Sequence, residues 1–375
     1  MPSNPLHDLT ALGQSIWYDN IQRSLLVNGE LARLISEDHV TGLTSNPTIF
    51  EKAIAHSNDY DAALTSLLQE SPRADASTLY EALTVQDIQA AADLLRSIYD
   101  ETNGADGYAS LEVSPLLAHD TEGSINEGRR LFRAVDRPNL MIKIPATPAG
   151  LPAIKALISE GINVNVTLMF SLQHYEDVVD AYLAGLEAWT GGGDLSKVAS
   201  VASFFVSRVD TIFDKALEAI SAAEAIALQG KIAIANAKVT YQRFETIINS
   251  KRFLKLQEKG ARPQRVLWAS TSTKNPNYSD VLYVEALIGS DTVNTMPPET
   301  LEKFKDHGIA QARLTEKVGE AQAILDQLAA LGIDYHDLTE ILQSAGVNAF
   351  TKSYKDLIKA LEAKRTEILA TVQSS

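Results

Sequence analysis

The sequence predicts an α/β protein that folds as a single (β/α)8 TIM barrel with additional helices. Short apolar, β-branched runs alternate with longer stretches that carry an apolar residue every three or four positions, which is the pattern of parallel strands joined by helices. The chain has 375 residues, 45% of them apolar or aromatic, so it can bury a large core. Eight strand-helix units need about 250 residues, which leaves roughly 125 for further helices.

Eight runs have the length and composition of buried strands. They lie at residues 15–18, 40–44, 109–113, 140–144, 163–167, 198–205, 265–269 and 292–295. The fourth and fifth runs show the composition of a buried strand most clearly.

Amphipathic stretches between the strands predict the helices. In one of them, Ser171 is expected to cap a helix whose apolar stripe includes Tyr175 and Tyr182. Three stretches exceed what a strand connection needs and predict additional helices near 58–101, 207–262 and 314–372. Since the glycine and proline clusters read as turns and no linker separates these stretches, residues 1–375 are expected to form one domain.

Basic residues gather in the C-terminal tail, at Lys352, Lys355, Lys359, Lys364 and Arg365. Such charges on an amphipathic helix most simply form its solvated face. The tail could also cover the mouth of the barrel.

Charge and composition exclude several classes of function. The chain has 33 Lys and Arg against 48 Asp and Glu, and its net charge of -15 disfavours binding to nucleic acid or to an anionic membrane surface. The absence of cysteine excludes disulfides, thiolate metal sites and cysteine nucleophiles, and makes the cytoplasm the expected location. No stretch of 18 residues is apolar enough for a membrane helix, and the first 20 residues do not resemble an export signal.

Lys143 is the strongest chemical signal. It interrupts the apolar run at 140–147, and the reactive groups of a barrel lie at the C-terminal ends of its strands. A lysine usually packs its stem and keeps its head in water, but both faces of a barrel strand are covered, so only the barrel mouth offers Lys143 polar partners. An amine attacks a carbonyl in its neutral form, which burial favours. Lys143 is therefore a candidate nucleophile.

Acids and amides occur at the ends of other predicted strands. They are Asp19, Asn46, Glu112, Asn165 and Thr167. Each alone has a structural explanation, because an Asn before proline usually forms a turn and an Asp after a strand usually caps the next helix. Gathered around one barrel mouth, they predict an active site.

Three motifs carry a resemblance to a known family. Thr-Ser-Asn-Pro-Thr at 44–48, Ile-Lys-Ile-Pro-Ala-Thr at 142–147 and Gly-Ile-Asn-Val-Asn-Val-Thr-Leu-Met-Phe-Ser at 161–171 occur in the order and spacing of the transaldolases, the lysine Schiff-base enzymes of the pentose phosphate pathway. The chain resembles this family from about Leu6 to the C-terminal helix. The Trp-Tyr-Asp start at 17–19 and the long insert after the sixth strand resemble its longer bacterial subgroup.

The resemblance implies a role for each candidate residue. Lys143 would form an imine with the C2 ketone of the substrate, and Glu112 would act through a water in forming and dehydrating the carbinolamine. Asp19 would take the C4 hydroxyl proton as the C3–C4 bond breaks, and Thr167 would hold the water. This division fits general acid–base chemistry, in which two carboxylates in different surroundings share the acid and base work.

The same resemblance implies how the retained three-carbon unit is held. Asn46 and Asn165 would hydrogen-bond it until an aldose phosphate arrives. No metal or cofactor is needed for this chemistry. The seven histidines lack His-x-His or His-Glu-x-x-His spacing, which disfavours a zinc-dependent aldolase without excluding scattered ligands.

A phosphorylated substrate also needs an anion site. Ser203 and Arg208 match the family's Ser-Pro-Phe-Val-Gly-Arg motif, in which this chain carries Phe204 and Ser207 at the second and fifth positions. Arg208 would bind phosphate at a helix N-terminus. Two further residues complete the predicted site: Phe205, which packs in the core or beside the substrate, and Lys274, which stands where the family frequently has arginine.

The sequence therefore predicts a transaldolase that exchanges a dihydroxyacetone unit between phosphorylated ketose and aldose substrates, as a monomer or homodimer. One alternative is a fructose 6-phosphate aldolase on the same barrel. That group resembles the chain around Lys143 but carries tyrosine where Glu112 stands, so Glu112 favours transfer. The other alternative is a non-catalytic barrel that binds sugar phosphates, for which Lys143 would be dispensable.

Overall fold

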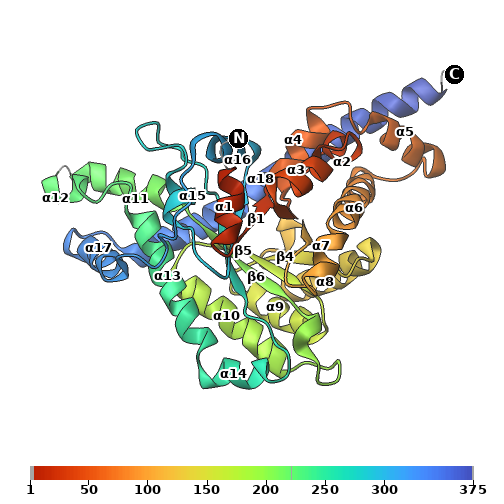
Figure 1. Ribbon diagram of the computed structural model, residues 1–375. Coiled ribbons are helices and arrows are strands. Elements are labelled where there is room, and N and C mark those ends of the chain that lie inside the picture. The colour runs from red at the N-terminus through yellow and green to blue at the C-terminus, as the bar shows by residue number, and fades with distance from the viewer. Residues whose placement is uncertain (1–3, 221, 374–375) are drawn as a thin grey trace.

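Eight parallel strands close into a barrel at the centre of the protein, in the order β1 to β8 (Figure 1). The computed structural model describes residues 4–220 and 222–373, so residues 1–3, 221, 374 and 375, which belong to the predicted domain and its additional helices, lie outside the described residues. The strands are β1 (Gln14–Tyr18), β2 (Val40–Thr44), β3 (Tyr108–Glu112), β4 (Leu140–Pro145), β5 (Val164–Met169), β6 (Ser200–Phe205), β7 (Arg265–Ala269) and β8 (Thr292–Met296). The predicted (β/α)8 barrel with additional helices is thus confirmed.

Helices surround the barrel on its outside (Figure 1). In chain order they are α1 (Pro5–Ala11), α2 (Arg23–Val27), α3 (Glu30–Asp38), α4 (Pro47–Ala55), α5 (Asp61–Glu70), α6 (Ala76–Leu94), α7 (Arg96–Glu101), α8 (Thr121–Val135), α9 (Gly150–Ser159), α10 (Leu172–Glu187), α11 (Ser207–Ile220), α12 (Ala223–Ile226), α13 (Ile232–Ile248), α14 (Lys251–Gln257), α15 (Leu282–Ala286), α16 (Pro298–His307), α17 (Val318–Ala330) and α18 (Tyr335–Gln373). Two 3-10 turns, η1 (Pro115–Leu117) and η2 (Leu195–Lys197), follow β3 and precede β6.

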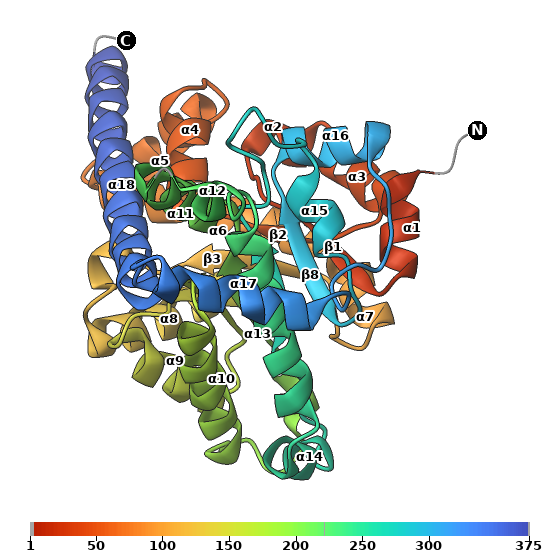
Figure 2. The same ribbon diagram turned by 90° about the vertical axis from the view of Figure 1, so that its left-hand side faces the viewer.

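Among the described residues, most of the helices beyond one per strand fall in three places: with α4 between β2 and β3 (α5, α6 and α7), in the run α11 to α14 between β6 and β7, and after α16 (α17 and α18). Two more lie earlier in the chain, since α1 precedes β1 and both α2 and α3 lie between β1 and β2. The 39-residue α18 packs against α4, α6 and α11 and runs along one edge of the molecule (Figure 2). None of the helices in the described part of the chain is long and apolar enough to span a membrane.

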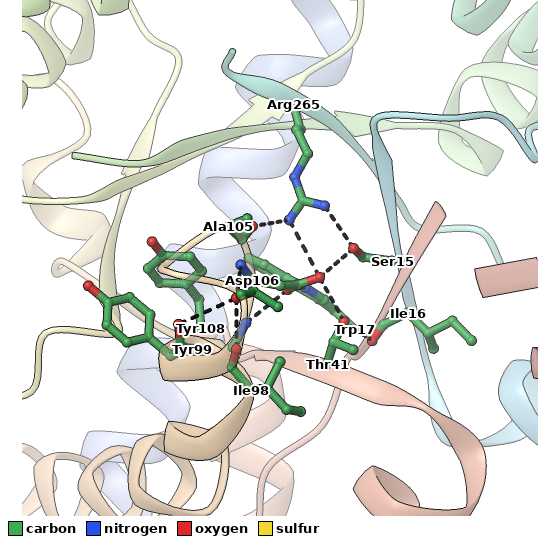
Figure 3. Close-up of polar contacts among 12 residues, drawn as sticks. Ser15, Ile16, Trp17, Thr41, Ile98, Tyr99, Ala105, Asp106, Tyr108 and Arg265 are labelled. Carbon is green, nitrogen blue, oxygen red and sulfur yellow. Dashed lines mark hydrogen bonds and ion pairs between the residues drawn. The ribbon is translucent and has the colours of Figure 1, made fainter. Parts of the chain in front are cut away.

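The carboxylate of Asp106 connects several strands at the N-terminal end of the barrel. Figure 3 shows Asp106, which precedes β3, accepting hydrogen bonds from Ser15 Oγ, from Trp17 Nε1 at 2.8 Å and from Thr41 Oγ1 at 3.0 Å. Arg265 at the start of β7 lies 3.7 Å from the same carboxylate and donates to Ser15 Oγ at 2.7 Å. Because these contacts join β1, β2 and β7 at the end away from the strands' carboxyl termini, we assign them to the stability of the barrel.

Candidate active site

A cavity of about 610 Å³ opens at the C-terminal end of the barrel. Eight of the ten predicted site residues line it: Asp19, Asn46, Lys143, Thr167, Ser203, Phe205, Arg208 and Lys274. The other two, Glu112 and Asn165, pair directly with Lys143 on the neighbouring strands β3 and β5. The parallel register therefore brings the ten residues to one end of the barrel.

Lys143 is held inside the barrel, as all six residues of β4 are buried. Its side chain is 6% exposed, and Nζ donates to the Ser45 carbonyl oxygen at 3.0 Å. Nζ also lies 3.4 Å from Oε2 of Glu112. Ser45 was not predicted from the sequence, although it belongs to the motif at 44–48.

Glu112 is buried beside the amine. Both carboxylate oxygens of Glu112 and the hydroxyl of Thr167 are inaccessible and have no hydrogen-bond partner among the described residues. Burial raises the pKa of Glu112, and the Lys143 ammonium opposes that rise. The register places Thr167 opposite Pro145, two residues beyond Lys143 on β4. A water or a substrate hydroxyl bound here would therefore find three acceptor oxygens beside the amine.

Asp19 follows β1 on another side of the cavity. Thr44 Oγ1, at the end of β2, donates to Asp19 Oδ1 at 2.7 Å, and Thr44 Oγ1 is itself 2.6 Å from Thr295 Oγ1 on β8. Burial raises the pKa of Asp19, while the Thr44 hydrogen bond and the charge of Lys143 lower it. Thr44 and Thr295 were not predicted as site residues, although Thr44 opens the same motif as Asn46.

The two amides take different positions. Asn46 caps α4, since its Oδ1 accepts from the Ile49 amide at 3.0 Å, and it also lines the cavity. The turn or cap expected of such a residue and a place in the site thus occur together. Asn165 is fully buried between Ser110 and Ser203: its Nδ2 donates to Ser110 Oγ at 3.1 Å, and its Oδ1 accepts from Ser203 Oγ at 2.6 Å.

A positively charged wall lies on the side of β6 and β7. Arg208 stands in the first turn of α11, with its guanidinium 5.2 Å from the centre of the Phe205 ring, and has no ion-pair partner in the described residues. Burial lowers the pKa of Arg208, but a guanidinium stays protonated at neutral pH. Burial and the nearby Arg208 charge also lower the pKa of Lys274, whose Nζ donates to Ser272 Oγ at 2.6 Å. Lys52 of α4 is a further cation on the cavity wall.

The two departures from the family motif have structural roles near this wall. Ser207 ties the start of α11 to the loop after β7, because its amide donates to the Ser270 carbonyl at 3.0 Å and the two hydroxyls are also 3.0 Å apart. Phe204 is fully buried and packs edge-on against Trp268 at 6.0 Å between ring centres. Phe205 is nearly buried against Phe170, so it serves the core and the cavity wall together.

The C-terminal tail reaches the site, since Phe350 of α18 lines the cavity. The interpretation of its basic residues as a solvated face is wrong for two of them. Lys364 Nζ donates to the Ser57 carbonyl at 2.6 Å and pairs with Asp61 at 2.7 Å, and Arg365 donates to the Ala74 carbonyl at 2.7 Å. These contacts fasten α18 to the helices before β3.

Comparison with known proteins gives a family for this arrangement. The model of the transaldolase/fructose-6-phosphate aldolase family matches residues 16–361. The chain belongs to this family. It is 48% identical over 367 residues to a transaldolase of Mycolicibacterium smegmatis, covering 97% of this chain and 98% of the relative. It is 50% identical to a transaldolase of Acidothermus cellulolyticus, over 96% of each chain, and 49% identical to one of Thermobifida fusca, over 95% of this chain and 96% of the relative.

These relatives are transaldolases, and they do not favour the fructose 6-phosphate aldolase alternative. Activity in this family implies phosphorylated sugars as substrates, which suits the positively charged wall. In the described residues, no group of three or more His, Asp or Glu side chains is placed to hold a metal ion.

Proposed function

We propose that the chain transfers a dihydroxyacetone unit between sedoheptulose 7-phosphate or fructose 6-phosphate and glyceraldehyde 3-phosphate or erythrose 4-phosphate, through an imine on Lys143. The observation that carries this proposal is the buried Lys143 amine 3.4 Å from a buried carboxylate, in the mouth of a barrel with a positively charged wall. A sheltered amine beside an acid is what imine formation with a ketone needs.

The first half of the reaction uses Lys143, Glu112 and Thr167. The Lys143 nitrogen adds to C2 of the ketose, and the carbonyl oxygen becomes the hydroxyl of a carbinolamine. Glu112, through a water that Thr167 also binds, delivers the proton with which that hydroxyl leaves as water. The raised pKa of Glu112 suits this role, because a carboxyl that keeps its proton to higher pH can donate it near neutrality.

Carbon–carbon cleavage then uses Asp19. Its carboxylate takes the C4 hydroxyl proton, the C3–C4 bond breaks, and its electron pair moves into the protonated imine to give an enamine on Lys143. The aldose phosphate leaves. The reverse steps join the retained three-carbon unit to C1 of the acceptor aldose, and hydrolysis of the new imine frees Lys143.

The remaining site residues would bind the substrate. Asn46 would hydrogen-bond the three-carbon unit from the cavity wall, and Asn165 would do so with Ser203, to which it is already bonded. Arg208 would hold the phosphate bidentately at the N-terminus of α11, with Lys274 as a second charge. The ring of Phe205 would help to position the Arg208 guanidinium through a cation–π contact.

The proposal extends to the whole chain. The barrel and its additional helices act as one catalytic domain, in which α18 contributes to the cavity wall. The enzyme works in the cytoplasm, where phosphorylated sugars are formed and retained, and it does so as a monomer or a homodimer.

A product assay tests the function. Fructose 6-phosphate is supplied with and without erythrose 4-phosphate, and sedoheptulose 7-phosphate and free dihydroxyacetone are measured. We expect the heptulose only when the acceptor is present. Free dihydroxyacetone without acceptor would support an aldolase instead, and neither product would support a barrel that only binds sugar phosphates.

A further inference from the structure

We propose that Gln343 of the C-terminal helix α18 is a positioning residue that aligns the strand ends carrying Lys143 and Thr167. This inference rests on the proposed function of those two residues. Gln343 is 6% exposed, and its Nε2 donates to the Ala146 carbonyl at 3.0 Å and to the Leu168 carbonyl at 3.2 Å. A glutamine amide nitrogen has two hydrogens, so both are used.

The two carbonyls belong to the residues just beyond the reacting groups. Ala146 lies three residues after Lys143, and Leu168 directly follows Thr167. The Ala146 amide donates to the Thr167 carbonyl at 2.8 Å, directly after Pro145 and Thr167, the last residue pair in the register of these two strands. Gln343 therefore joins the ends of β4 and β5 immediately above the amine and the hydroxyl that the reaction uses.

The backbone at this point needs such support. Leu168 has a φ of 63°, in the left-handed region that a leucine rarely adopts, and the pairing of β5 with β6 shifts register between Val166 and Met169. Thr167 lies within this irregular segment. A rare backbone conformation persists only when its surroundings hold it, and the Gln343 amide bonds the carbonyl of the rare residue itself.

The helix also packs closely on Leu168. Gly346 lies one turn after Gln343, and a Cβ at this position would be 2.8 Å from Leu168 Cδ2. The glycine thus lets α18 approach the β5 end closely enough for the Gln343 amide to reach both carbonyls.

Docking of α18 does not depend on Gln343. Leu357 and Leu361 are buried further along the helix, and Lys364 and Arg365 bond to carbonyls of the segments around α5. Removal of the Gln343 amide should therefore leave the helix in place. It would leave two buried carbonyls unpaired and free the strand ends to shift.

The test compares Gln343→Met with Thr339→Val. Methionine keeps the length of the side chain and removes both donors. Thr339 is a matched control, because it is fully buried one turn earlier on α18 and, among the described residues, its hydroxyl donates only to the His336 carbonyl of the same helix. Gln343→Asn is an intermediate variant, whose amide is one methylene shorter and cannot keep both bonds.

For Gln343→Met we expect kcat to fall about 10- to 100-fold with KM changed less than about threefold, since small misplacement of reacting groups costs rate more than binding. The rate of borohydride trapping of the triose on Lys143 should fall by the same factor, and Gln343→Asn should lie between the wild type and Gln343→Met. Thr339→Val should keep kcat within about threefold at a similar loss of thermal stability.

The inference is overturned if Thr339→Val loses as much kcat as Gln343→Met, or if Gln343→Met and Gln343→Asn lose only stability or only raise KM. Failure of the proposed function can be distinguished from failure of the Gln343 role, because the wild-type enzyme would then form no sedoheptulose 7-phosphate. The inference is judged from the trapping rates of the variants relative to wild type.

Discussion

Thr44→Val offers a sharp test of Asp19 as the base. Valine keeps the branched shape of threonine but removes the hydroxyl that donates to Asp19 Oδ1 at 2.7 Å. This hydrogen bond lowers the pKa of a carboxyl that burial raises, so its loss should raise the pKa further. A hydrogen bond to a charged group is worth about 1.5–3 kcal/mol, and 1.36 kcal/mol corresponds to one pH unit.

The acid limb of the kcat/KM profile should therefore move to higher pH by about 1–2 pH units in Thr44→Val. The sign follows from the role of Asp19: the base acts when ionised, and a raised pKa leaves less of it ionised at any given pH. The profile is measured with fructose 6-phosphate and erythrose 4-phosphate. Most of the activity lost near pH 6 should return as the pH rises.

Thr295→Val is the control for this experiment. It removes the neighbouring contact to Thr44 Oγ1, at 2.6 Å, and leaves the Thr44 donor to Asp19 in place. Its acid limb should stay close to that of the wild type. If the limb of Thr44→Val did not move, or moved to lower pH, ionisation of Asp19 would not control the reaction and its role as base would be refuted.

Three further predictions concern other charges. Glu112→Gln should slow imine formation about 10²- to 10⁴-fold, measured by single-turnover trapping, and an unchanged rate would remove Glu112 from that step. Arg208→Ala should raise the KM for phosphorylated donors about 10- to 100-fold. As a control, Lys52→Ala removes an exposed cation of the cavity wall and should change KM severalfold at most, while making KM less dependent on salt concentration. Equal effects of the two variants on KM would contradict the assignment of Arg208 to the phosphate. Burial raises the pKa of Asp210 to about 6, so between about pH 4 and 6 the folded state keeps a proton that the unfolded state has lost. Because folding then opposes ionisation of this carboxyl, the free energy of unfolding should fall by on the order of 3 kcal/mol between pH 4 and 7. Asp210→Asn should remove this fall in urea titrations, and an unchanged slope would place its cause elsewhere.

The fold could be predicted because strand and helix signals are local. The runs predicted at 40–44 and 265–269 have the bounds of β2 and β7, and the other strands differ from the predicted runs by one or two residues at one or both ends. In the barrel, strand order follows chain order, so the polar residues at strand ends were expected at one mouth.

The partners of those residues could not be predicted, because they come from distant parts of the chain. The hydrogen bond between Thr44 and Asp19 joins residues 25 positions apart in the sequence, and the bond between Gln343 and Leu168 joins residues 175 positions apart. A periodic apolar pattern shows that one face of the C-terminal helix is buried, but not what it is buried against. The ties of Lys364 and Arg365 to the segments around α5 were missed for the same reason.

Reductive trapping tests most directly whether the Lys143 amine carries the reaction. The enzyme is incubated with fructose 6-phosphate, reduced with borohydride and digested, and the modified peptide is mapped by mass spectrometry. We expect one triose adduct, on Lys143, and none in Lys143→Met, which should stay folded but show no turnover. An adduct on another lysine of the cavity, or full activity without any adduct, would contradict the proposed chemistry.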